Sequence, residues 1–166
     1  MIARLRALVV LAALIAGACG SRTPPPYRPG PIDVAYEQGG EEMRLSRLRG
    51  RPVVLALVRI SEITSEMFID QLVDAHARAA GNTRFVVLSI APNEAPFLGE
   101  YVAQRELPFP VGLADWSVAE GTSDLGLVPI VPTTYLVDEE GAIVQGVAGA
   151  VKADDLVREI ARRGWR

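Results

Sequence analysis

Two short apolar runs constrain what this chain can fold into. Residues 52–58 (Pro-Val-Val-Leu-Ala-Leu-Val) and residues 85–90 (Phe-Val-Val-Leu-Ser-Ile) carry no charge and are rich in valine and leucine, which predicts strands covered on both faces. Between them, apolar residues recur at helical spacing at Phe68, Leu72, Ala75 and Ala79. This spacing predicts a helix over 61–80. Two buried strands joined by a helix favour parallel pairing through a crossover.

The pattern on either side extends this unit. Before it, alternating apolar residues at 32–36 and 43–45 flank a glycine-rich turn and predict a strand hairpin. After it, we expect a helix over 95–105, a strand over 109–113, a helical turn within 116–124, strands over 133–137 and 142–147, and a helix from about 154. The sequence therefore predicts a three-layer α/β/α domain with an N-terminal strand extension and a C-terminal β-hairpin plus helix.

The N-terminus has the pattern of an export signal. Arg4 and Arg6 precede an apolar run over 7–18, and no acidic residue occurs before Cys19. The run has about 12 residues, fewer than the roughly 20 that a membrane-spanning helix needs. The small residues before Cys19 (Ala-Gly-Ala) resemble a bacterial lipobox, which implies that Cys19 is acylated. The alternatives are a marginal transmembrane anchor and an ordinary secreted protein with one free thiol.

These features divide the chain into three parts. Residues 1–18 are predicted to be a lipoprotein signal peptide. Residues 19–31 are predicted to form the lipid anchor and a linker, which holds five prolines and favours extended polyproline II structure. Residues 32–166 are predicted to form one folded domain, located on the extracytoplasmic side of a bacterial envelope, at its periplasmic or surface face.

Charge and cysteine content exclude several functions. The whole chain has 17 basic and 20 acidic residues, and removal of residues 1–18 takes away two arginines, which leaves 15 and 20 and a formal charge of −5. An acidic domain without a basic run is a poor candidate for nucleic-acid binding. It also offers no polybasic patch for anionic lipid, so we expect membrane contact through acylated Cys19 alone. Because Cys19 is the only cysteine, no disulfide can form within the chain.

Three stretches resemble one family. The lead-in to the first apolar run reads Leu-Ser-Arg-Leu-Arg-Gly-Arg-Pro-Val-Val over 45–54, and Leu-Pro-Phe-Pro-Val follows over 107–111. The most specific is Val-Pro-Thr-Thr-Tyr-Leu-Val-Asp-Glu-Glu-Gly-Ala-Ile-Val over 131–144. In this order they resemble the thioredoxin-like redoxins of the TlpA/ResA type. The resemblance spans about 32–164. It implies a thioredoxin-like fold, thiol–disulfide chemistry and a cis peptide bond before Pro132.

The chain departs from that family at its reactive site. The family places Trp-Cys-x-x-Cys at the start of its first long helix, where the helix N-terminus favours a thiolate. Here Ser61 and Thr64 keep the spacing but carry hydroxyls, and the segment aligns one or two residues shorter. A hydroxyl near pH 7 is not ionised without a strong base beside it, and it cannot exchange with a disulfide. The activity of the family therefore does not transfer to these positions.

Although the reactive cysteines are absent, the resemblance still implies a peptide-binding groove. In the family, the backbone beside the cis-proline faces the start of the first long helix and binds extended peptides, which here implies a groove formed by Ile60, Ser61, Val131, Pro132 and Thr133. We therefore expect a lipid-anchored module that binds an envelope protein or peptide and is not an enzyme. One alternative is a redoxin, TlpA-like or of antioxidant type, that acts as a thiol–disulfide oxidoreductase with cysteines of a partner. Another is a purely structural surface lipoprotein.

Other residues give little sign of chemistry. His76 is the only histidine and has no cysteine or second histidine to share a metal. Asp138, Glu139 and Glu140 could bind calcium, but the sequence Asp-Glu-Glu-Gly between two predicted strands favours a solvated turn. We therefore expect neither a metal nor a cofactor.

Overall fold

The computed structural model describes residues 30–79 and 81–165. The predicted signal peptide, the linker up to residue 29 and Cys19 lie outside the described residues. The strands are β1 (Ala35–Gln38), β2 (Glu41–Arg44), β3 (Val53–Val58), β4 (Arg84–Ser89), β5 (Val111–Ala114), β6 (Thr133–Val137) and β7 (Ile143–Ala148). The α-helices are α2 (Ile63–Arg78), α3 (Ala95–Arg105), α4 (Trp116–Ala119) and α5 (Ala153–Arg162). Two short 3-10 turns, η2 (Leu45–Leu48) and η3 (Pro92–Glu94), complete the order.

The strands form one mixed sheet in the order β2-β1-β5-β4-β3-β6-β7. Strands β3, β4 and β5 are parallel, as the helices between them require. Strand β6 runs antiparallel to β3 and pairs with β7 in a hairpin, and β1 runs antiparallel to β5. The predicted α/β fold class is confirmed. All six residues of β3 are buried, as the uncharged run predicted.

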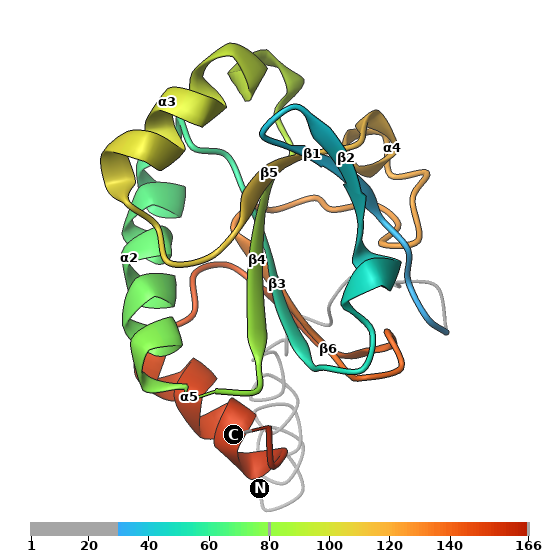
Figure 1. Cartoon of the computed structure of the whole chain (residues 1–166), viewed down its shortest axis with the longest axis vertical. Coiled ribbons are helices and arrows are strands. Elements are labelled where there is room, and N and C mark those ends of the chain that lie inside the picture. Colours follow the sequence, from blue (N-terminus) through green and yellow to red (C-terminus); the bar gives the residue numbers. More distant parts are fainter. Residues whose placement is uncertain (1–29, 80, 166) are drawn as a thin grey trace, which may run out of the picture.

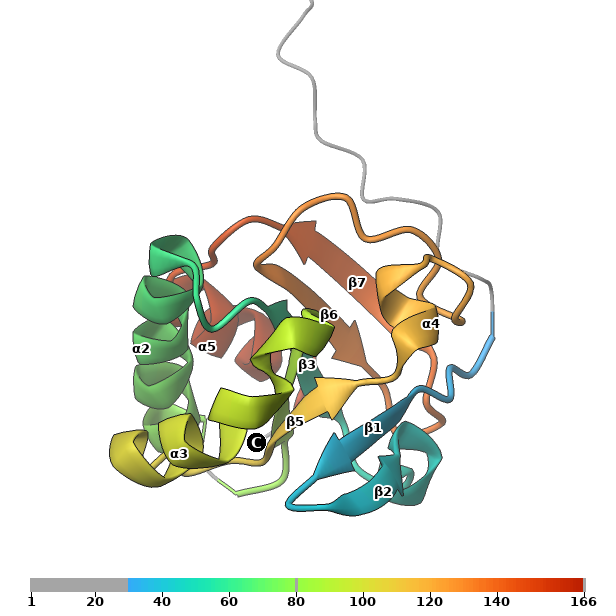
Figure 2. The same ribbon diagram turned by 90° about the horizontal axis from the view of Figure 1, so that it is seen from above.

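The helices cover the two faces of the sheet unequally (Figures 1 and 2). Helices α2 and α5 pack on one face, where Phe68, Leu72, Leu156 and Ile160 are buried against β3 and β4, and α3 adds Leu98. The other face is covered by η2, the one-turn helix α4, the loop after α4 and the segment before β1, which bury Ile32, Leu45, Val118 and Leu125. The third layer of the predicted architecture is therefore present but thin.

The bounds of α3 and β6 are the predicted ones, and the other element boundaries differ from the predicted ones by at most three residues. Helix α2 begins at Ile63 and not at residue 61, because Arg59–Glu62 form a turn in which the Glu62 N–H donates to the Arg59 carbonyl at 3.0 Å. Strand β1 begins at Ala35 rather than 32. Among residues 30–79 and 81–165, no helix is long and apolar enough to cross a membrane.

Candidate functional site

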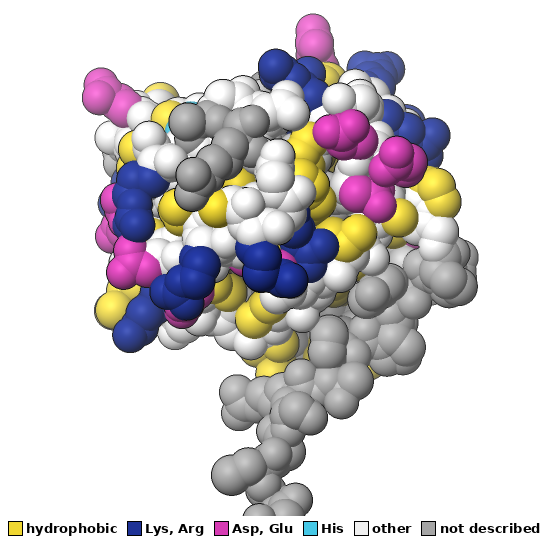
Figure 3. All heavy atoms as spheres, turned by 90° about the horizontal axis from the view of Figure 1, so that it is seen from below, with side chains coloured by type: hydrophobic (Ala, Val, Ile, Leu, Met, Phe, Trp, Pro, Cys, Tyr) yellow, Lys and Arg dark blue, Asp and Glu magenta, His cyan; other side chains and the backbone are white. Residues whose placement is uncertain are grey.

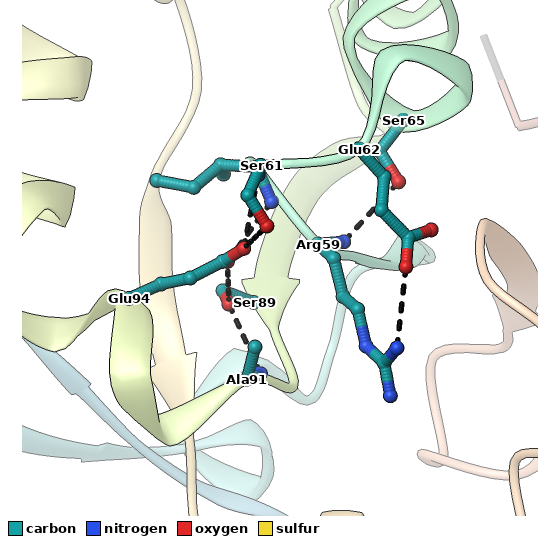
Figure 4. Close-up of polar contacts among 8 residues, drawn as sticks. Arg59, Ser61, Glu62, Ser65, Ser89, Ala91 and Glu94 are labelled. Atoms are coloured by element: carbon teal, nitrogen blue, oxygen red, sulfur yellow. Dashed lines mark hydrogen bonds and ion pairs between the residues drawn. The ribbon is translucent and has the colours of Figure 1, made fainter.

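The turn between β3 and α2 is held by a carboxylate from another part of the chain. Glu94 ends η3, directly after β4, and only 2% of it is exposed. Its Oε2 accepts the Ile60 N–H and its Oε1 accepts the Ser61 N–H, both at 2.9 Å. The Ser61 hydroxyl donates to Oε1 at 2.5 Å, and the Ser89 hydroxyl donates to Oε2 at 2.6 Å (Figure 4). Glu94 therefore joins the end of β3, the end of β4 and the start of α3.

These bonds decide the charge of Glu94. Burial raises the pKa of its carboxyl group, but the hydrogen bonds from Ser61, Ser89 and the Ile60 backbone outweigh burial, so the pKa lies below its ordinary value. The carboxylate has about four lone-pair sites, and four donors use them. A carboxylate with a lowered pKa and no free lone pair is a poor general base. Glu94 is thus an ionised anchor, and it is a poor base for activating the Ser61 hydroxyl that it binds.

The two hydroxyls of this cluster have fixed roles. Ser89 Oγ donates to Glu94 and accepts the Ala91 N–H at 3.2 Å, which fixes the turn that follows β4. The Ser61 hydroxyl also donates its hydrogen bond to Glu94, and Ser61 is exposed. Ser61 can therefore offer only its lone pairs to an incoming group.

The predicted positions of the lost cysteines lie on either side of the helix start. Ser61 precedes α2 by two residues, and Thr64 is an exposed second residue of the helix. A second pair with the same spacing is Glu62, the N-cap residue, and Ser65. Ser65 is fully buried, and its Oγ accepts the Arg59 N–H at 3.2 Å. The Glu62 carboxylate pairs with the Arg59 guanidinium at 3.2 Å.

The second half of the predicted groove lies at the same end of the sheet. Thr133 is opposite Leu57 in the pairing of β6 with β3, so Val131–Thr133 lie beside the end of β3 that leads into Ile60 and Ser61. The peptide bond between Val131 and Pro132 is cis, as expected. The Pro132 carbonyl accepts the Gly149 N–H at 2.8 Å, and the Thr133 hydroxyl donates to the Ile130 carbonyl at 2.6 Å.

A shallow hollow of about 340 Å³ separates the β3–α2 turn from α3. Ile60, Ser61, Glu94, Phe97 and Tyr101 line it together with two polar residues of α3. Phe97 is 63% exposed, and on α2 Ile63 is 78% and Met67 66% exposed. Ile63 and Met67 are four residues apart, so they share one face of α2. Phe97 thus lines a hollow whose polar centre is already hydrogen-bonded, and Ile63 and Met67 add exposed apolar surface on the adjoining helix α2.

The described residues hold no group of three or more His, Cys, Asp or Glu side chains able to bind a metal ion. The His76 ring packs edge-on against Phe85 and Phe109, with centroids 5.2 and 5.7 Å apart. In the acidic turn, Asp138 Oδ1 accepts the Ala142 N–H at 2.7 Å and so closes the hairpin. This carboxylate has a role in the turn itself.

Comparison with known proteins places the fold. No family model matches the chain, and no curated protein matches it. Solved structures do match. StoA from Bacillus subtilis superposes with a TM-score of 0.62 at 17% identity, over 77% of this chain and 96% of that chain. A DsbF homologue from Corynebacterium diphtheriae gives 0.67 at 19%, over 80% and 85%. The exposed lipoprotein thioredoxin of Streptococcus pneumoniae gives 0.61 at 18%, over 78% and 98%.

The domain has a thioredoxin fold. Within this thioredoxin fold, the β3–α2 turn and the cis-proline segment occupy the end of the sheet that the sequence resemblance indicated. Sequence reasoning did not find Glu94. The signal was a carboxylate four residues after the end of the uncharged run over 85–90, but a Glu at the start of a predicted helix is equally explained by the helix dipole.

Proposed function

We propose that this thioredoxin-fold protein is lipid-anchored on the extracytoplasmic side of a bacterial envelope and binds a partner protein or peptide beside Ser61 and Pro132. In this proposal the domain does not itself exchange disulfides. The observation that supports this proposal is the cluster around Glu94. Its buried carboxylate accepts the backbone N–H groups of Ile60 and Ser61 and the Ser61 hydroxyl, in the turn before α2. The site is thus built as a fixed surface without a reactive group.

Exposed apolar side chains support binding at this surface. Ile63, Met67 and Phe97 each expose more than half of their area around the turn, and Ile130 is 43% exposed just before Val131. Clusters of exposed large apolar residues mark interaction sites more often than isolated ones do. The backbone beside a cis-proline at a strand start also suits an extended ligand, which binds through main-chain hydrogen bonds.

A photo-crosslinking amino acid placed at Ile63 in the membrane-bound full chain tests the proposal. We expect one defined partner to be captured from Ile63 and its capture to be suppressed by Met67→Asp. The matched control places the same probe at Trp116, which is 57% exposed on α4, the helix on the opposite side of the sheet from α2 (Figure 2). Equal capture from both positions, or capture that Met67→Asp leaves unchanged, would contradict the proposal.

A second candidate function is favoured by the structural neighbours, among them a "thiol:disulfide interchange protein" from Chlorobium tepidum at 18% identity and a TM-score of 0.65. In this reading the protein assists disulfide exchange with cysteines supplied by a partner. The captured partner distinguishes the two. If adding this protein accelerates reduction of an insulin disulfide by the partner, and Ile63→Asp removes the acceleration, the second function holds.

A further inference from the structure

The two edges of the sheet differ in how they are protected. At one edge, three of the four residues of β2 are charged, namely Glu41, Glu42 and Arg44. At the other, β7 has no charged residue and no proline in its six positions (Figure 2). Charged residues and prolines are the usual devices that keep an edge strand from pairing with another chain. The one irregularity of β7, at Val144, leaves residues 145–148 in regular register.

The pairing of β7 shows which backbone groups are free. The Gly149 N–H bonds to the Pro132 carbonyl, so this is a hydrogen-bonded pair of the ladder. Bonded pairs alternate along an antiparallel ladder, so Gln145 and Val147 also direct their backbone groups toward β6. Gly146 and Ala148 therefore direct their N–H and C=O groups outward, where no strand lies among the described residues. Both have small or absent side chains, so another backbone can approach closely.

A hollow of about 560 Å³ lies beside this edge, between the β6–β7 hairpin and α5. Its apolar lining includes Leu136, Val147 and Leu156. Thr134 lines the same hollow and is 2% exposed, yet its hydroxyl has no hydrogen-bond partner within residues 30–79 and 81–165. Buried hydroxyls are nearly always hydrogen-bonded, so an unpartnered one facing a hollow points to a missing acceptor or donor.

The rim of the hollow carries excess positive charge in an acidic protein. Lys152, Arg158 and Arg162 line it, against Asp155 and Glu159. The two carboxylates pair with the two arginines, Asp155 with Arg158 at 3.2 Å and Glu159 with Arg162 at 2.6 Å, so the excess is the single charge of Lys152. Lys152 forms no ion pair among the described residues, although its charge also acts on the nearby Asp154. Figure 3 views the molecule from below Figure 1, the end at which α5 lies, and shows Lys and Arg side chains among apolar and acidic ones.

We propose that the outer edge of β7 and the adjoining hollow form a docking surface for an extended, acidic segment of a partner protein. The segment adds as a strand to β7 through Gly146 and Ala148. Every second side chain of an added strand faces the α5 side of the sheet, so apolar side chains enter the hollow and a carboxylate reaches its cationic rim. This surface adjoins the Ser61–Pro132 groove at Ala148, which pairs with Thr133, but it uses the edge of β7 that faces away from β6. Variants of that edge therefore test it without touching Ser61 or Pro132, and its failure leaves the groove proposal standing.

The test uses a synthetic peptide of alternating valine and threonine in which two threonines are replaced by glutamate, and a control peptide with lysine at those two positions. The full chain with Cys19→Ser is titrated with each, and amide hydrogen exchange is measured. We expect the acidic peptide to slow exchange at Gly146 and Ala148 and to bind at least tenfold more tightly than the basic one. The variant Gly146→Pro should abolish binding, because it removes an outward N–H while no bond to β6 is lost.

A second variant keeps the test decisive if Gly146→Pro does not fold. Ala148→Glu places a charge on the edge and should weaken the acidic peptide at least tenfold, whereas Met43→Glu on β2 should not change its binding. Three results would overturn the proposal. One is the absence of peptide binding. Another is slow amide exchange at Gly146 and Ala148 in the absence of peptide, if deletion of residues 20–29 makes that exchange fast. This result would show that the linker occupies the edge. The last is a dimer that Gly146→Pro dissociates, which makes a second copy the occupant.

Discussion

Ser61 and Glu94 are joined twice, although 33 residues separate them in sequence. The backbone N–H of Ser61 and its hydroxyl both donate to the same carboxylate oxygen, at 2.9 and 2.5 Å. Because the carboxylate also binds Ile60 and Ser89, it fixes the turn at which thiol chemistry would take place in a redox-active relative.

Replacing Glu94 with Gln should destabilise the domain by about 2–4 kcal/mol. The NH2 group of the Gln amide would face N–H and O–H groups that are themselves donors, so buried donors would lose their acceptor. Ser61→Ala should cost only about 1 kcal/mol, since it removes one hydrogen bond and leaves the Ser61 N–H bound. Urea denaturation of purified domains measures both. Glu100→Gln is the control, because Glu100 is exposed and bonded only by Gln104, and it should leave the urea midpoint unchanged.

The stabilisation by Glu94 should depend on pH. Its pKa in the folded state lies below the ordinary 4.5, so its ionised form stabilises the fold above about pH 4.5, and this contribution is lost as pH falls through the folded pKa. The stability gap between the wild type and Glu94→Gln should therefore be widest near neutral pH and narrow below pH 4.5. Denaturation curves across this range measure the gap. A gap that widens on acidification would contradict the assignment of Glu94 as an ionised anchor.

Restoring thiols should depend on which pair is replaced. In a Cys19→Ser background, Glu62→Cys with Ser65→Cys places one thiol at the N-cap of α2 beside Arg59, where the helix N-terminus and the guanidinium favour a thiolate. We expect this pair to form a disulfide and to reduce insulin slowly. Ser61→Cys with Thr64→Cys should not, because residue 61 lies in the turn and residue 64 is exposed on the helix. Insulin turbidity and thiol titration compare the two, and equal activity would contradict the distinction.

Cys19→Ala should release the protein from membranes or leave the precursor unprocessed, because the predicted acyl chains would be absent. Detergent phase separation of cell extracts measures the partition, and mass spectrometry reads the N-terminus. Ser21→Ala, two residues beyond Cys19, should behave as wild type. Wild-type mature protein in the aqueous phase with an unmodified N-terminus would contradict the anchor.

The sequence predicts more of the fold than of the site. The uncharged runs at 52–58 and 85–90 predicted β3 and β4 because a strand buried on both faces leaves no alternation to misread. The start of α2 was predicted two residues too early, because the turn over Arg59–Glu62 depends on bonds to Ser65 and Glu94 rather than on local propensity. Ser61 was noticed for its spacing, yet its partner Glu94 was not, because the contact is created by the return of the chain after β4.

The anchoring of the turn from outside has a consequence for how such a protein can diverge. Each candidate cysteine pair has one member, Thr64 or Glu62, whose side chain makes none of the bonds that tie the turn to Glu94. Within the turn, that carboxylate binds the backbone of Ile60 and the backbone and hydroxyl of Ser61. Shape and reactivity are therefore partly separable at this end of the sheet. Substitutions can remove or restore the reactive side chains while the backbone that presents them keeps its shape. A domain of this kind can therefore change its function before its fold changes.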